Sequence, residues 1–126
     1  MALIGTFKAE TLAKGVIRAE WTGITATGPG RCLDAFAYPD KTVVLSGTIG
    51  SGTTVVIQGS NTATSVLTTG AAGFYTLTDQ SDNALSLSTG KAETIAQNPQ
   101  YIRPLVTAKN ANTNVKVTIM AQSVRR

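Results

Sequence analysis

The chain has 126 residues, of which 42% are hydrophobic and 14% are charged, a composition that suits one globular domain rather than a disordered chain. Its formal charge is +4, but only Arg125 and Arg126 stand together among the basic residues, which argues against a nucleic-acid binder. No apolar run approaches the length of a transmembrane helix, so we expect no membrane partner.

The N-terminal segment, residues 1–14, contains Leu3, Ile4 and Phe7, but Gly5 and its short length make a helix marginal. Its first residues are also too short an apolar run for a signal peptide, so we expect synthesis and folding in a cytoplasm. Because free termini are usually disordered unless docked, we predict an extended N-terminal arm that packs on another subunit rather than on its own core.

The next part of the chain predicts two strands. Gly15–Trp21 is the first, the glycine-bearing segment Thr22–Gly30 is a loop, and the alternating run Cys32–Tyr38 is the second. Cys32 is the only cysteine, so no disulfide can form within the chain, and we expect it to be a small buried apolar side chain.

The clearest local pattern lies in the middle of the sequence. Two β-branched runs, Val43–Thr48 and Thr54–Gly59, flank the tripeptide Gly50–Gly52. β-Branched residues favour strands, and glycine supplies the positive φ of a tight reversal. The pattern therefore predicts a β-hairpin in which the two runs pair antiparallel.

The C-terminal half predicts further short strands separated by turn residues, with Asn61–Gly73 as a polar connection that crosses between sheets. Pro104 indicates an edge or a bulge, because proline has no N–H to donate. The strands expected here are Phe74–Thr78, Ala84–Ser88 with Leu85 and Leu87 on one face, Ala92–Ala96, Tyr101–Ala108, and Asn114–Ala121 with Val115, Val117 and Ile119 on one face.

Eight or nine short strands and no long helix predict an all-β fold, an antiparallel β-sandwich or jelly roll with an extended N-terminal arm. We divide the chain into the arm at 1–14, a single β-sandwich domain at 15–122, and a polar tail at 123–126.

The sequence offers no constellation for catalysis, a cofactor or a metal. It has no histidine, the commonest general base and a frequent zinc ligand. Gly47–Gly52 has no following helix to hold phosphate. Asp79, Asp82 and Asn83 could supply oxygens to calcium, but their residue types are also those of a turn, which we favour. We therefore expect no enzyme, no cofactor and no small-molecule substrate.

Two other groups of residues allow alternative roles. The aromatic residues Trp21, Phe74, Tyr75 and Tyr101 could form a sugar-stacking platform, although we favour a place in the core. Arg103 lies in an apolar strand, where it could pair with an acid of the same fold or reach a carboxylate of a partner.

Several strand and turn blocks between Thr42 and Met120 together resemble the small structural proteins of tailed bacteriophages, of the jelly-roll capsid cement or head-decoration type. These blocks are Val43–Thr48, Val55–Asn61, Leu77–Asp79, Glu93–Ile95, Pro99–Thr107 and Val115–Ile119. The residues before Thr42 match no pattern of that type. The resemblance implies a protein that binds the outside of an assembled capsid, often as a dimer or trimer, and carries no catalytic residues.

On this basis we expect a structural virion protein on the capsid exterior, whose partners are the major capsid protein and further copies of itself. Rival expectations are a phage tail or baseplate protein and a carbohydrate-binding β-sandwich module. The residues expected to contact partners are Leu3, Ile4, Phe7, Arg103, Arg125 and Arg126.

Overall fold

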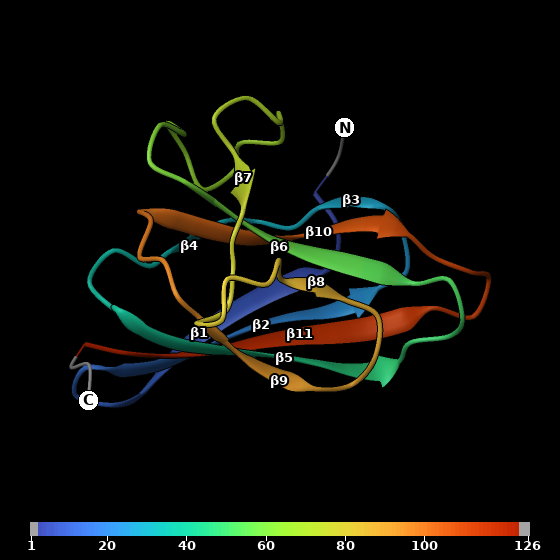
Figure 1. Ribbon diagram of the computed structural model, residues 1–126, viewed down its shortest axis with the longest axis horizontal. Helices are drawn as coiled ribbons and strands as arrows, with labels where there is room; N and C mark the ends of the chain where they lie inside the picture. The colour runs from blue at the N-terminus through green and yellow to red at the C-terminus, as the bar shows by residue number, and fades with distance from the viewer. Residues whose placement is uncertain (1–2, 124–126) are drawn as a thin grey trace.

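The computed structural model describes residues 3–123, and these form two antiparallel sheets packed face to face (Figure 1). The predicted all-β sandwich is confirmed. Sheet A has the strand order β1 (Thr6–Ala13), β2 (Val16–Ile24), β11 (Asn114–Gln122), β5 (Asp40–Thr48) and β9 (Ala92–Ile95). Sheet B has the order β3 (Gly28–Pro29), β10 (Tyr101–Ala108), β6 (Thr54–Ser60) and β7 (Tyr75–Thr76), with β4 (Leu33–Asp34) beside β10 and β8 (Ser86–Leu87) beside β6. Within residues 3–123, no helix is long and apolar enough to cross a membrane.

Alternation along the long strands builds the core between the sheets. Val115, Val117 and Ile119 of β11 are all buried, and so are Leu85 and Leu87, as their spacing predicts. Trp21 of β2 is fully buried and belongs to this core. Cys32 is buried as well, and desolvation raises the pKa of its thiol, which leaves it a packing residue.

The predicted hairpin between Val43–Thr48 and Thr54–Gly59 is wrong. Strand β5 pairs with β11 and β9 in sheet A, whereas β6 pairs with β10, β7 and β8 in sheet B. Gly50–Gly52 does reverse the chain, with φ of +72° at Gly50 and +75° at Gly52. The reversal carries the chain from one sheet to the other, so the apolar faces of β5 and β6 meet across the core instead of lying side by side.

The predicted strand Cys32–Tyr38 is mostly wrong, because only Leu33–Asp34 pairs as β4. Backbone groups on either side bond to loops instead: Cys32 N–H donates to the Val66 carbonyl at 2.8 Å. The buried ammonium of Lys41 donates to the Tyr38 carbonyl at 2.7 Å and to Asn98 Oδ1 at 2.8 Å, which holds this segment in a turn.

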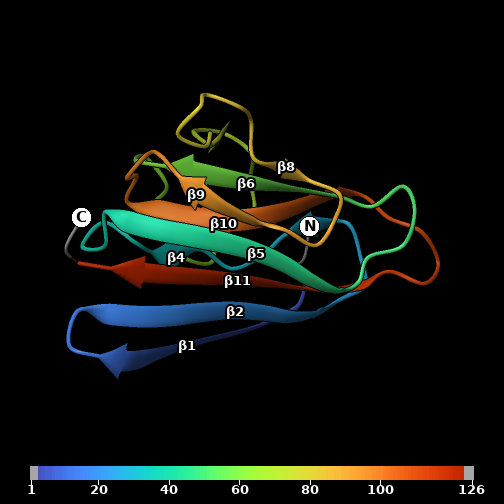
Figure 2. The same ribbon diagram turned by 60° about the horizontal axis from the view of Figure 1, so that its bottom comes forward.

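The predicted arm is extended, but it belongs to its own sheet. Residues Thr6–Ala13 pair with β2 as strand β1, and Ile4 is buried in the core with its N–H bonded to the Pro29 carbonyl at 2.9 Å. The expectation that this segment does not pack on its own core is therefore wrong. Its position still leaves it outermost, because β1 forms one edge of sheet A and β9 forms the other (Figure 2).

Strand β10 has the predicted bounds and explains how a sheet tolerates Pro104. Gly30 N–H donates to the Pro104 carbonyl at 2.8 Å, from the chain that runs between β3 and β4. A strand residue points its N and its carbonyl to the same side. Pro104, which has no N–H, therefore turns this position toward β3 and β4, each of which pairs with β10 at only two residues. The ladder to β6 runs through Pro104 without a shift, and its register changes only between Val106 and Ala108.

Candidate functional site

The structure assigns Arg103 an internal role. Its side chain points out of sheet B, yet it is only 1% exposed, because the β6–β7 connection covers it. Its Nε donates to Gln58 Oε1 at 3.0 Å, and its two terminal nitrogens donate to the carbonyls of Thr68 at 3.1 Å and Gly70 at 3.0 Å. The guanidinium also lies 3.5 Å from the ring centroid of Phe74. Arg103 therefore holds the connection onto sheet B, and the expectation that it contacts a partner is wrong.

The other residues expected to contact partners separate by position. Ile4 is buried in the core, so it is not available to a partner. Leu3 and Phe7 are partly exposed, and Phe7 packs on Trp21 with ring centroids 5.1 Å apart. Arg125 and Arg126 lie outside the described residues.

The outer face of sheet A is the broad surface that sequence reasoning missed. It consists of the outward side chains of the long strands, which are Lys8, Glu10, Arg18, Glu20, Thr42, Val44, Ser46, Lys116, Thr118 and Met120. In Figure 2 the strands β1, β2, β11 and β5 run side by side across this face. The outward residues of the inner strands are half-buried by their neighbours, as expected for a flat, closely spaced surface.

A network of alternating charges crosses the β1 side of this face. Arg18 bonds to Glu10 on β1 and lies 3.9 Å from Glu20, and Lys116 of β11 lies 2.5 Å from Glu20. The hydrogen bond from Lys116 is the main cause that lowers the pKa of Glu20. The sequence feature that could have indicated this network is the pair Arg18 and Glu20, two positions apart in a predicted strand. In the structure the residue between them, Ala19, is buried.

The segment considered for calcium is a turn with its own internal bonds. Asp79 Oδ1 accepts hydrogen bonds from Ser81 N–H at 2.8 Å and Asn83 N–H at 3.0 Å. These backbone donors lower the pKa of Asp79. Within residues 3–123, no group of three or more acids, histidines or cysteines is placed to hold a metal.

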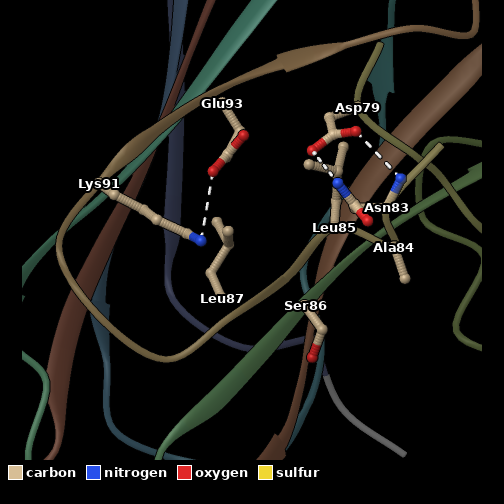
Figure 3. Close-up of a pocket in the computed structure, with 8 residues that line it drawn as sticks. All are labelled: Asp79, Asn83, Ala84, Leu85, Ser86, Leu87, Lys91 and Glu93. Atoms are coloured by element: carbon tan, nitrogen blue, oxygen red, sulfur yellow. Dashed lines mark hydrogen bonds and ion pairs between the residues drawn. The ribbon is translucent and has the colours of Figure 1, made fainter. Parts of the chain in front are cut away.

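This turn borders a small polar hollow of about 200 Å³, shown in Figure 3. Lys91 and Glu93 lie on its other side and form an ion pair of 3.2 Å. The floor includes the buried side chains of Leu85 and Leu87. The charged groups that line it are thus already paired with their neighbours.

A larger hollow, of about 450 Å³, lies where several loops meet beside sheet B. Its lining residues are Asp34, Phe36, Asn61 and Gln100. Phe36 is 66% exposed, and the Asn61 side chain accepts the Gln100 N–H at 2.9 Å. The hollow combines one open aromatic ring with amide and carboxylate groups.

The aromatic residues considered for a sugar platform do not form one row. Trp21 is fully buried, and its indole N–H donates to the Arg31 carbonyl at 2.8 Å. Phe74 is half-buried under Arg103, and Tyr101 is half-buried in β10. Among these four residues only Tyr75 is exposed, at 43%.

Comparison with known proteins finds one similar solved structure. No protein-family model matches the chain, and no curated protein matches it. One solved structure similar to this chain is the SPBc2 prophage-derived protein YomS, with 11% sequence identity and a TM-score of 0.49. The similarity covers 89% of this chain and 98% of that protein.

Proposed function

We propose that this protein is a non-enzymatic structural component of a bacteriophage virion. In this role it is made in the host cytoplasm, binds the outer surface of the assembled capsid and cements neighbouring major capsid subunits. Many copies, each with a moderate contact across a subunit boundary, would act together through multivalency.

The observation that carries the proposal is the contrast between the two outer faces of the sandwich. On sheet B, the β6–β7 connection of the same chain covers part of the outer face, where Arg103 binds it. Sheet A presents a wide outer face of small, β-branched and paired charged side chains, with Val44 half-buried near its centre. Such a flat, mixed surface suits contact with another protein. The resemblance of the strand blocks from Thr42 to Met120 to capsid cement proteins supports the same role.

The test is titration of the protein onto capsids stripped of it, followed by heating with light-scattering detection. Because a protein that binds only the assembled shell stabilises it by mass action, the disruption temperature should rise with added protein. Val44→Arg, which places a charge in the outer face of sheet A, should weaken binding. The matched control Leu67→Arg changes a residue that is 60% exposed in the β6–β7 connection and should bind as the wild type does.

A carbohydrate-binding role is the second candidate, because Phe36 stands open beside polar groups in the larger hollow. Aromatic faces with nearby amides and carboxylates are suited to sugars. Saturable binding on a glycan array that Phe36→Ala abolishes, together with no binding to capsids, would replace the cement proposal. Binding to tails but not to heads would move the protein to a tail or baseplate.

A further inference from the structure

Strand β1 is an edge strand whose outer side is open. It is eight residues long, its inner side pairs with β2, and within the described residues no strand pairs with its outer side. A long open edge offers a row of backbone donors and acceptors to another strand. Figure 2 shows β1 as the last strand of sheet A, with β2 on one side only.

The charges on β1 are placed so that they can face opposite charges on the β1 strand of a second copy. Lys8 and Glu10 both point to the outer face of sheet A, with Ala9 between them on the opposite side. Across the pair with β2, Lys8 lies opposite Glu20 and Glu10 lies opposite Arg18. Each charge therefore already has an opposite charge on its inner side.

We propose that a second copy of this chain pairs with β1 through its own β1, antiparallel, around a two-fold axis that passes through Ala9. In this register Lys8 lies opposite Glu10 of the second copy, and Glu10 lies opposite Lys8 of the second copy. Each row of outward side chains across the junction then alternates in sign: Glu20 and Lys8 of one copy are followed by Glu10 and Arg18 of the other.

The charges select this register over its neighbours. A two-fold antiparallel pair keeps the outer faces of both sheets on one side only when it is centred on a residue. Centring on Lys8 would place two ammonium groups opposite each other, and centring on Glu10 would do the same with two carboxylates. Like charges directly opposite are destabilising, whereas centring on Ala9 brings two opposite-charge pairs together.

The inward side of the strand accepts the same arrangement. Ala9 is exposed and meets its own symmetry mate, where its small side chain permits close approach. Half-buried Phe7 lies opposite exposed Thr11 of the second copy. The result is one continuous sheet with five strands from each copy, which doubles the outer face of sheet A. The pairing rests on β1 alone, so it stands or falls independently of the proposed function.

Two single charge reversals test the register. Lys8→Glu gives two carboxylate pairs across the junction, and Glu10→Lys gives two ammonium pairs, so each variant should raise the dimer dissociation constant at least about tenfold. An equimolar mixture of the two variants should recover the dimer as a heterodimer, because each acidic position then faces a basic one. Sedimentation velocity measures all three samples, and far-UV circular dichroism checks that each variant is folded.

A cysteine at the axis gives an independent measurement. Ala9→Cys places two thiols directly opposite each other, so mild oxidation should yield a covalent dimer. The matched control is Thr11→Cys, also exposed on β1, whose symmetry mate lies four residues away along the strand, about 13 Å, and should not cross-link. A monomeric wild type at 100 µM, or equal cross-linking of both cysteine variants, would overturn the proposal. So would a variant mixture that stays monomeric.

Discussion

At the scale of single residues, Arg103 shows how a basic side chain on the outside of a sheet can act as a core residue. It makes three hydrogen bonds, to one side-chain oxygen and two main-chain carbonyls, and stacks on Phe74. Burial without a neighbouring acid lowers the pKa of the guanidinium. Arginine remains charged in such a site, so its hydrogen bonds to carbonyls are charge-assisted.

Arg103→Ala should lower the free energy of unfolding by about 2–4 kcal/mol, because it removes three charge-assisted bonds and leaves the carbonyls of Thr68 and Gly70 to water. Urea denaturation measures this loss, and limited proteolysis should cleave the β6–β7 connection sooner than in the wild type. Lys109→Ala, which removes an exposed positive charge near the end of the same strand, should leave both measurements nearly unchanged. An unaltered cleavage rate in Arg103→Ala would contradict the role of Arg103 in holding this connection.

The sequence marks Arg103 as an unusual residue but cannot predict its partners. An arginine between Ile102 and Pro104 stands out in an apolar strand. Two of its three acceptors are main-chain carbonyls from a connection more than thirty positions earlier, and main-chain groups carry no sequence signature. Lys41 is missed for a similar reason, since one of its acceptors is the Tyr38 carbonyl.

At the scale of elements, the long apolar strands of the core are predictable and the edge strand is not. Tyr101–Ala108 is predicted with its observed bounds, and Asn114–Ala121 within one residue. Strand β11 alternates because one face of it is buried, whereas in β10 Arg103 on the outer face is buried as well. Strand β1 lies at the sheet edge, and its residues are all exposed or half-buried. Its sequence therefore lacks the alternation of apolar residues that predicts a strand.

Substitution by alanine should have different effects on stability at the two ends of the segment that contains β1. Ile4 is 7% exposed in the core and Leu12 is 45% exposed beyond it. Ile4→Ala should therefore cost about 2–4 kcal/mol of unfolding free energy, and Leu12→Ala less than about 0.5 kcal/mol. Thermal or urea unfolding of the two variants gives the comparison. Equal and small effects would mean that the N-terminal residues do not belong to the core.

At the scale of the whole molecule, most strand pairs join distant parts of the chain. Sheet A places the C-terminal strand β11 between β2 and β5, and sheet B places β10 between β3 and β6. Local patterns identify such strands, but the order in which they pair depends on the packing of the entire sandwich. This is why the strands could be predicted in large part and the partner of β5 could not.

Non-local pairing also sets the speed of folding. Because loop closure must precede these contacts, we expect refolding from urea to take milliseconds to seconds. Trp21 is the single tryptophan and lies opposite Val117, so its fluorescence reports the joining of β2 to β11. Stopped-flow fluorescence and stopped-flow circular dichroism should give the same main phase. Recovery of native fluorescence within microseconds would contradict this expectation.

The connection between β5 and β6 has a consequence for length variation in this protein. In a hairpin, one inserted residue shifts a strand against its neighbour and turns its apolar face outward. Here β5 takes its register from β11 and β9, and β6 takes its register from β10. A Cβ at Gly52 would meet nothing within 4 Å. Insertions after Gly52 should therefore leave the register of both strands unchanged, provided that the bonds of buried Thr53 to Ile49 and Thr113 are kept, which makes this turn a place to graft a foreign peptide.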